Sequence, residues 1–124
     1  MMKKIILILL VILVYTASVN AKYTQTCKVK YKKNYGWSDY YTVNVIFMSG
    51  MELNKATRTY NYESYSTYAT IFWGKDEASV IKLSSYTGCG SEVTKSCIDN
   101  KVMNLEGEDQ DGRDWEICTK SYCF

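Results

Sequence analysis

The stretch that most constrains the fold is Tyr60–Trp73, YNYESYSTYATIFW, which holds six of the chain's 18 aromatic residues. Aromatic and β-branched side chains suit the half-buried surface of a β-sheet and lose rotamer freedom in a helix. The alternation is interrupted at Glu63–Ser64, so we expect an outer strand over Arg58–Tyr62 and an inner strand over Tyr65–Trp73. The inner strand is apolar on both faces towards its end, which is typical of a central strand. One continuous strand with a bulge at Ser64 is the alternative.

Period-two alternation recurs along the rest of the chain. In its last occurrence, Trp115 and Ile117 are expected to face the core, while Asp114, Glu116 and Cys118 face outwards. The further strands predicted in this way are Thr26–Lys32, Tyr40–Met48, Ala78–Ser84, Val102–Gly107 and Arg113–Thr119.

Polar turn signals connect these strands. The segment Gly74–Glu77, GKDE, predicts a hairpin between the inner strand and the strand that follows it. The Asp-Gly pair within Glu108–Gly112 predicts a second hairpin. Met51–Ala56 is interpreted as a linker or a single helical turn, and no other segment predicts a helix. The chain therefore has about seven strands, and the fold class is all-β: a small antiparallel sandwich or a closed barrel, stapled by disulfides.

Residues 1–21 predict a signal peptide rather than part of the fold. Two lysines precede the apolar run Ile5–Val14, and Val19–Ala21 offers compact residues for cleavage. The run is shorter than the roughly 20 apolar residues that a membrane span needs, and an uncleaved anchor is the alternative. We therefore expect export, one domain over residues 22–124, a secreted or periplasmic location and no stable membrane insertion after cleavage.

Five cysteines follow the predicted signal peptide, and export makes disulfides their default state. Cys89–Cys97 is the preferred pair because both residues lie in one glycine-bearing loop, and closing such a loop stabilises the fold by about 2–3 kcal/mol. Cys118 and Cys123 pair with each other, or one of them pairs with Cys27. Cys27 lies on the apolar face of its strand and Cys118 on the polar face of its own, which disfavours that pair. The unpaired thiol, Cys27 or one of the last two, is expected to be buried and inert.

The chain contains no histidine, which removes the commonest general base and the Ser-His and Cys-His nucleophile pairs. This absence argues against an enzyme of ordinary design. A pair of carboxylates acting as in a glycosidase is the remaining catalytic hypothesis. Its candidates cluster around the predicted second hairpin: Glu106, Glu108, Asp109, Asp111, Asp114 and Glu116.

Asp109 and Asp111 in this hairpin match part of the EF-hand calcium pattern. The full pattern fails, because Gly107 stands where the first ligand is needed and Cys118 where the bidentate glutamate is needed. A calcium loop of another type is a weak alternative to a plain acidic hairpin turn. We therefore expect no metal centre and no cofactor.

Eleven tyrosines and three tryptophans follow the predicted signal peptide, more than so small a core hides comfortably. Both residue types are enriched at recognition surfaces. We expect some of them to form a flat platform for a ligand or partner, although cross-strand tyrosine pairs with solvated hydroxyls are the alternative. The predicted contact residues are Tyr35, Trp37, Tyr40, Tyr60 and Tyr62.

Charge is distributed unevenly along the chain. Residues 22–60 carry seven basic and two acidic residues, whereas residues 61–124 carry six basic and eleven acidic residues. Either a basic strand pairs with an acidic one inside the molecule, or the surface has two poles. We predict an exported binding module that presents an aromatic surface to a protein partner, inhibitor-like, on a rigid β scaffold. A carbohydrate-binding module is the alternative, so the partner is a protein or a polysaccharide, and no nucleic-acid motif is present.

Overall fold

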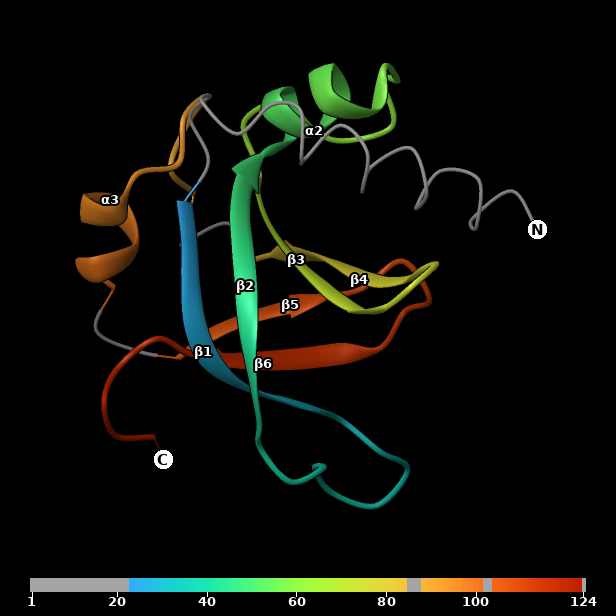
Figure 1. The fold of residues 1–124 in the computed structure, drawn as a ribbon, viewed down its shortest axis with the longest axis vertical. Helices are drawn as coiled ribbons and strands as arrows, with labels where there is room; N and C mark the ends of the chain where they lie inside the picture. The colour runs from blue at the N-terminus through green and yellow to red at the C-terminus, as the bar shows by residue number, and fades with distance from the viewer. Residues whose placement is uncertain (1–22, 85–87, 102–103, 124) are drawn as a thin grey trace.

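The computed structural model describes residues 23–84, 88–101 and 104–123, which form a closed barrel of six antiparallel strands in chain order (Figure 1). The barrel closes because β1 pairs with β2 on one side and with β6 on the other. The closed barrel, one of the two predicted architectures, is thus confirmed. The strands are β1 (Tyr23–Tyr31), β2 (Tyr41–Ser49), β3 (Thr67–Gly74), β4 (Glu77–Leu83), β5 (Leu105–Glu108) and β6 (Asp114–Cys118); the helices are α2 (Gly50–Thr57) and α3 (Lys95–Asp99).

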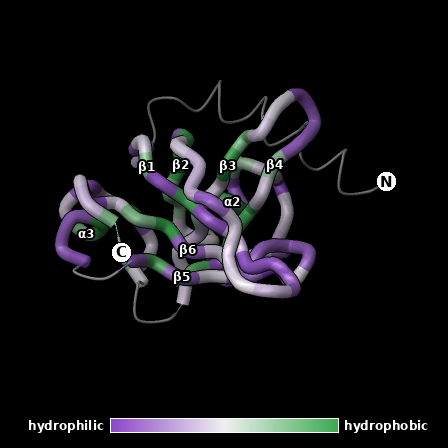
Figure 2. Tube along the Cα trace, turned by 90° about the horizontal axis from the view of Figure 1, so that it is seen from below, coloured by the Kyte–Doolittle hydropathy of each residue, from purple (hydrophilic) through white to green (hydrophobic). Residues whose placement is uncertain are grey.

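Alternate side chains of each strand point into the barrel. In β1, Cys27 and Val29 are buried inside and Lys28 between them is exposed. In β6, Trp115 and Ile117 face the core, as predicted. Hydrophobic segments therefore lie along the strands, whereas hydrophilic segments predominate in the connections (Figure 2). The buried residues of the barrel are Cys27, Val29, Val45, Phe47, Ala69, Ile71, Ile81, Leu83, Val93, Ile98, Leu105, Trp115 and Ile117.

Strand β3 is covered on both faces, which confirms the prediction of a central strand. Its inward residues Ala69 and Ile71 belong to the barrel core. Its outward residue Tyr68 belongs to a second cluster, in which Leu53 of α2 packs against the outside of β2, β3 and β4. The tyrosine-rich stretch therefore supplies a strand that is buried on both faces.

Helix α2 has eight residues and replaces the predicted linker or single turn at Met51–Ala56. The Ser49 hydroxyl accepts a hydrogen bond from the Glu52 N–H, and the Glu52 carboxylate accepts one from the Ser49 N–H. This reciprocal capping box is a sequence-readable start signal, Ser-x-x-Glu. Neither described helix is long and apolar enough to cross a membrane.

The predicted outer strand Arg58–Tyr62 is wrong, and so is the alternative of one bulged strand. Arg58 ends α2 with a left-handed backbone, φ 57°, and residues 59–66 form a loop. The Asn54 side chain holds this loop, because its amide donates to the Tyr62 carbonyl and its oxygen accepts from the Tyr62 N–H. Two tertiary hydrogen bonds thus override the strand propensity of the tyrosines.

The connection between β4 and β5 covers one end of the barrel and contains α3, in a region predicted to be a loop. Val93 and Ile98 are buried in the barrel cluster, and the disulfide Cys89–Cys97 ties the connection to itself. The Cys89 N–H donates to the Thr67 hydroxyl at 3.0 Å, and the Val93 N–H donates to the Glu52 carboxylate at 3.4 Å. The predicted strand start at 102–103 lies outside the described residues.

The seam between β4 and β5 is the shortest in the barrel. Its close approach depends on Gly107, because a Cβ there would lie 2.4 Å from the Lys82 carbonyl oxygen. Among the described residues of β4 and β5, two pairs stand in register, Lys82 with Glu108 and Leu83 with Gly107.

A side chain extends this short seam. Beyond Glu108 the backbone turns away into the β5–β6 hairpin. The Gln110 side chain then takes the place of a strand, since its oxygen accepts from the Val80 N–H at 2.9 Å and its amide donates to the Ala78 carbonyl at 2.8 Å. The amide thereby satisfies two backbone groups of β4 that the missing part of β5 would otherwise pair.

The cysteines form two disulfides, Cys89–Cys97 and Cys118–Cys123. The preferred pair is confirmed, and the second pair is the local one of the two alternatives. Cys118 lies on the outward side of β6, as predicted, yet it is buried because its disulfide brings the C-terminal segment back over it. Cys27 is unpaired and buried inside the barrel. The two disulfides agree with an oxidising compartment; the predicted signal peptide lies outside the described residues.

The Cys27 thiol is predicted to be inert in the folded protein. Burial raises the pKa of this thiol to about 12, so at pH 8 it stays protonated as well as inaccessible. We expect intact-mass measurement without reductant to show no iodoacetamide adduct on the folded protein and a single adduct in guanidinium. Equal rates of modification in the two conditions would contradict a buried thiol.

The Gln110 side chain is predicted to stabilise the barrel. Gln110→Ala removes two hydrogen bonds worth about 0.5–1.5 kcal/mol each, so we expect urea unfolding to show a loss of about 1–3 kcal/mol. Lys75→Ala, at an exposed residue of the neighbouring β3–β4 turn, is the control and should change stability by less than about 0.5 kcal/mol. Hydrogen exchange at the Val80 N–H should accelerate in Gln110→Ala alone. Unchanged exchange there would refute the role of this amide.

Candidate functional site

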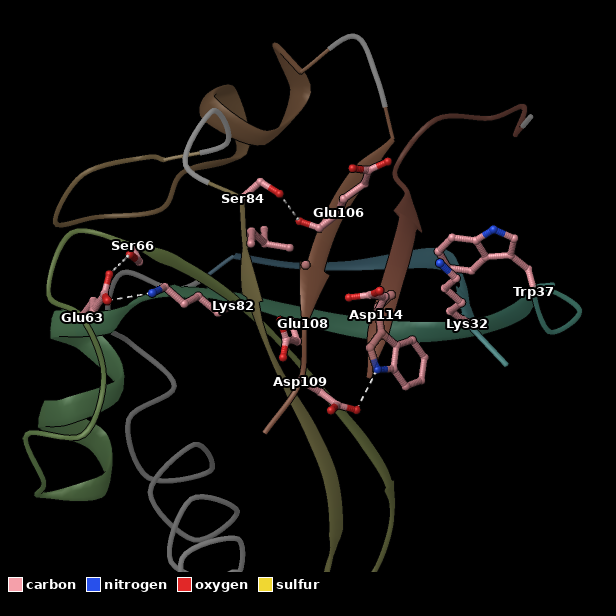
Figure 3. Close-up of a pocket in the computed structure, with 13 residues that line it drawn as sticks. Lys32, Trp37, Glu63, Ser66, Lys82, Ser84, Glu106, Glu108, Asp109 and Asp114 are labelled. Carbon is pink, nitrogen blue, oxygen red and sulfur yellow. Dashed lines mark hydrogen bonds and ion pairs between the residues drawn. The ribbon is translucent and has the colours of Figure 1, made fainter. Parts of the chain in front are cut away.

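A groove crosses the outer surface of β4, β5 and β6 and ends at the β1–β2 loop (Figure 3). Its volume is about 820 Å³, within the range of about 300–1,000 Å³ that is common for ligand sites. Glu63 lies at one end and Trp37 at the other, with acidic side chains between them. The lining residues are Lys32, Trp37, Glu63, Ser66, Lys82, Leu83, Ser84, Glu106, Gly107, Glu108, Asp109, Asp114 and Trp115.

The strand register places like charges opposite each other in and beside this groove. Glu106 of β5 stands directly opposite Glu116 of β6, and Glu108 stands opposite Asp114. Directly opposed like charges destabilise a sheet. Within the described part of the chain, the ion pairs include Glu116 but not Glu106, Glu108 or Asp114.

Lys30 of β1 compensates Glu116. The Lys30 ammonium lies 3.1 Å from the Glu116 carboxylate, and both side chains are less than one-fifth exposed. The hydrogen bond to Glu116 is the main reason that the pKa of Lys30 is raised. The same ammonium lies 5.3 Å from the Trp37 ring centroid and 4.9 Å from the Tyr40 ring centroid. Cation–π attraction thus adds to the ion pair and fixes both aromatic rings against β1.

Lys82 does not neutralise the acidic residue that it faces. It stands opposite Glu108 in register, but its ammonium lies 2.7 Å from the Glu63 carboxylate at the end of the groove (Figure 3). The hydrogen bond between them lowers the pKa of Glu63 and raises that of Lys82. Both side chains are largely exposed, so this pair contributes little stability. Its effect on the site is to draw the lysine away from β5.

The structure does not bring the five predicted contact residues together. Tyr35 is 97% exposed and Trp37 41% exposed in the β1–β2 loop, where Tyr40 is half-buried. Tyr60, 98% exposed, and the half-buried Tyr62 lie in the loop after α2, on the opposite side of the molecule (Figure 1). The predicted single platform therefore divides into two separate regions, because the outer strand that would have aligned them is a loop. Of the five residues, Trp37 lines the groove.

Sequence reasoning missed an aromatic cluster at the end of the barrel away from α3. Tyr31, Tyr41, Trp73 and Trp115 form a closed cycle, in which neighbouring ring centroids lie 5.4 to 6.2 Å apart. Tyr41 is 42% exposed and Trp73 38% exposed, whereas Trp115 is buried. Alternation in the sequence places each ring on the inward side of its own strand. That the four rings contact one another depends on how β1, β2, β3 and β6 are arranged in the barrel, which alternation does not reveal.

The acidic hairpin is held together by Asp109. One oxygen of its carboxylate accepts from the N–H groups of Asp111 and Arg113, and the other accepts from the Trp115 indole. Among the described residues, no three acidic or cysteine side chains are grouped so that they could hold a metal ion. Asp109 thus serves as a turn residue, and the weak calcium hypothesis gains no support from this geometry.

Comparison with known proteins identifies no relative of this chain. No protein-family model matches the chain, and no curated protein or solved structure resembles it at a significant level. Evidence for a function therefore comes from the fold and from the groove.

Lys30 is predicted to stabilise the groove. Lys30→Met leaves Glu116 opposite Glu106 without a cation, so we expect the free energy of unfolding at pH 7 to fall by about 1–2 kcal/mol. Lys28→Met, at an exposed lysine two positions earlier on the same strand, is the matched control and should be near neutral. A raised lysine pKa adds stability that is present below the unfolded pKa, about 10.4, and lost as pH rises through the folded pKa. The difference between native and Lys30→Met proteins should therefore shrink in alkaline urea titrations; a constant difference would contradict the ion pair.

Proposed function

We propose that this chain is a small exported binding module that holds a protein partner in the groove over β4, β5 and β6, in the manner of an inhibitor or adaptor. The observation that carries the proposal is the coincidence of Trp37, the predicted contact residue in this groove, with a cavity of about 820 Å³. Export to a secreted or periplasmic location is part of the proposal, supported by the two disulfides.

Three features of the groove support protein binding. Trp37 is held by Lys30 and yet remains 41% exposed, so it offers a preorganised ring at one end. The floor is a closed barrel with a packed interior, which is a rigid support. The open groove exposes several charged side chains along its length (Figure 3). Polypeptide partners are held in this way, by an aromatic anchor and a polar rim.

Carbohydrate binding is the second candidate, and the aromatic cluster at the barrel end favours it. Tyr41 and Trp73 meet nearly edge-on, at 79°, and both are partly exposed. The Trp73 indole N–H already donates to the Ser79 hydroxyl at 2.9 Å, so this residue offers its ring surface for stacking rather than its polar atom. The carboxylate-pair enzyme remains a third hypothesis with no separate observation in its favour.

The test compares two exposed aromatic residues on opposite sides of the molecule. The secreted chain is immobilised and exposed to envelope and culture-fluid proteins of its source cells, beside Trp37→Ala and Tyr60→Ala variants. We expect a partner to be retained by the native chain and by Tyr60→Ala, and its retention to fall at least tenfold with Trp37→Ala, which removes a rigid aromatic anchor worth about 1.4 kcal/mol or more.

Other outcomes of this experiment would reject the groove. Equal retention by the native chain and both variants would indicate adhesion that does not depend on Trp37, and loss with Tyr60→Ala alone would move the site to the loop after α2. A parallel experiment with envelope polysaccharide and a Trp73→Ala variant tests the carbohydrate candidate, which retention lost with Trp73→Ala but kept with Trp37→Ala would support. Unfolding curves of each variant separate loss of binding from loss of fold.

A further inference from the structure

The outer surface of three neighbouring strands, β1, β6 and β5, carries charges in rows and columns. In one row across the sheet, Lys30 of β1 faces Glu116 of β6, which faces Glu106 of β5. In the next row, Asp114 of β6 faces Glu108 of β5; the Lys32 backbone N–H donates to the Asp114 carbonyl at 2.9 Å. The grid therefore has a basic column on β1 and acidic columns on β6 and β5.

The molecule shows which kind of chain complements such an acidic column. Strand β1 and the residue that follows it carry lysines at every second position, Lys28, Lys30 and Lys32, and β1 lies in an extended conformation beside β6. Its central lysine makes the ion pair with Glu116. The acidic column on β5, Glu106 and Glu108, lies one strand further away, because β6 separates β5 from these lysines. Its other neighbour, Lys82, is drawn to Glu63.

We propose that the partner segment bound in the groove is an extended polypeptide with lysine or arginine at every second position, lying over Glu106 and Glu108. Side chains two residues apart on an extended chain point the same way and are separated by about 6.4–6.8 Å. Glu106 and Glu108 have this spacing, because they lie on one face of β5. This inference rests on the proposed function and specifies the chemistry of the partner.

The rest of the groove agrees with such a segment. Trp37 at one end offers an aromatic surface to a further cation or apolar side chain. The Glu63–Lys82 pair at the other end is exposed and can exchange one cation for another. The cavity is long and open rather than a compact cage (Figure 3), so it fits a chain of residues better than a single ion. An acidic partner or nucleic acid would be repelled by the same carboxylates.

The test uses two synthetic peptides that have the same amino-acid composition but different sequences. In one peptide, arginines alternate with threonine and valine; in the other, the arginines are consecutive. Both are titrated into the native protein by calorimetry at low ionic strength. We expect the alternating peptide to bind at least tenfold more tightly than the consecutive one, and its affinity to fall when salt is raised and the carboxylates are screened.

Variants of the column locate the site. Glu106→Gln with Glu108→Gln should weaken the alternating peptide at least tenfold, whereas Glu77→Gln with Glu92→Gln, two exposed acidic residues outside the groove, should leave it unchanged. The first pair of substitutions removes like-charge opposition, so we expect its melting temperature to equal or exceed that of the native protein. If the glutamine variant loses both peptide binding and melting temperature, the aspartate variant Glu106→Asp with Glu108→Asp decides, because it keeps both carboxylates. Peptide binding by the aspartate variant would support the proposal, and its loss in a folded aspartate variant would contradict it.

Three results would overturn the proposal: equal affinity for both peptide orders, binding of the polyamine spermidine as tight as that of the alternating peptide, or undiminished binding by Glu106→Gln with Glu108→Gln. These failures are distinct from failure of the proposed function. If Trp37→Ala still abolishes capture of a partner while no basic peptide binds, the groove stands as a protein site and the basic-partner inference falls.

Discussion

Pairing of the first strand with the last is the interaction on which the rest of the structure depends. It converts a meander of six strands into a closed barrel, so none of them is left as a free sheet edge. Closure also gives alternate side chains one common interior. The connection bearing Val93 and Ile98 covers one end of that interior, and four contacting aromatic rings fill the other. The shortest seam, between β4 and β5, depends on Gly107 for close approach and on Gln110 for two further hydrogen bonds.

Closure also determines the electrostatics of the surface. The uneven charge distribution along the chain allowed two interpretations, internal pairing or a surface with two poles. Pairing β1 with β6 brings Lys30 to Glu116, which supports internal pairing for this row. It cannot extend to Glu106 and Glu108, because a whole strand separates them from the lysines of β1. Internal pairing is therefore seen for Glu116, whereas the acidic column on β5 is left facing the groove.

The parts of the fold that follow from local periodicity were predictable. Alternation correctly identified the inward faces of β1 and β6, the burial of β3 on both sides and the parity that disfavoured a Cys27–Cys118 bridge. Tyrosine content wrongly predicted a strand at Arg58–Tyr62, because tertiary hydrogen bonds determine the backbone there. Asn54 holds Tyr62 in a loop, and periodicity in the sequence does not reveal this contact. The capping box at Ser49 and Glu52 was a readable signal for α2. Gln110 was not predictable, because its role depends on the register between two strands that are separated by a long connection.

Of the five predicted contact residues, the candidate site contains Trp37 alone; four of the six acidic residues named as catalytic candidates also line it, namely Glu106, Glu108, Asp109 and Asp114. Composition shows that aromatic side chains exceed what the core needs, but only strand order decides which of them share a surface. The acidic column shows a further conflict that composition conceals. A neutral residue at Glu106 or Glu108 would relieve the repulsion between β5 and β6. Carboxylates that are not opposite each other would keep the protein equally soluble. Local choices that oppose the stability of the fold are expected where a surface has another requirement to meet. In this barrel the opposed carboxylates line the groove that ends at Trp37, so the least favourable charges and the preorganised aromatic ring belong to one surface.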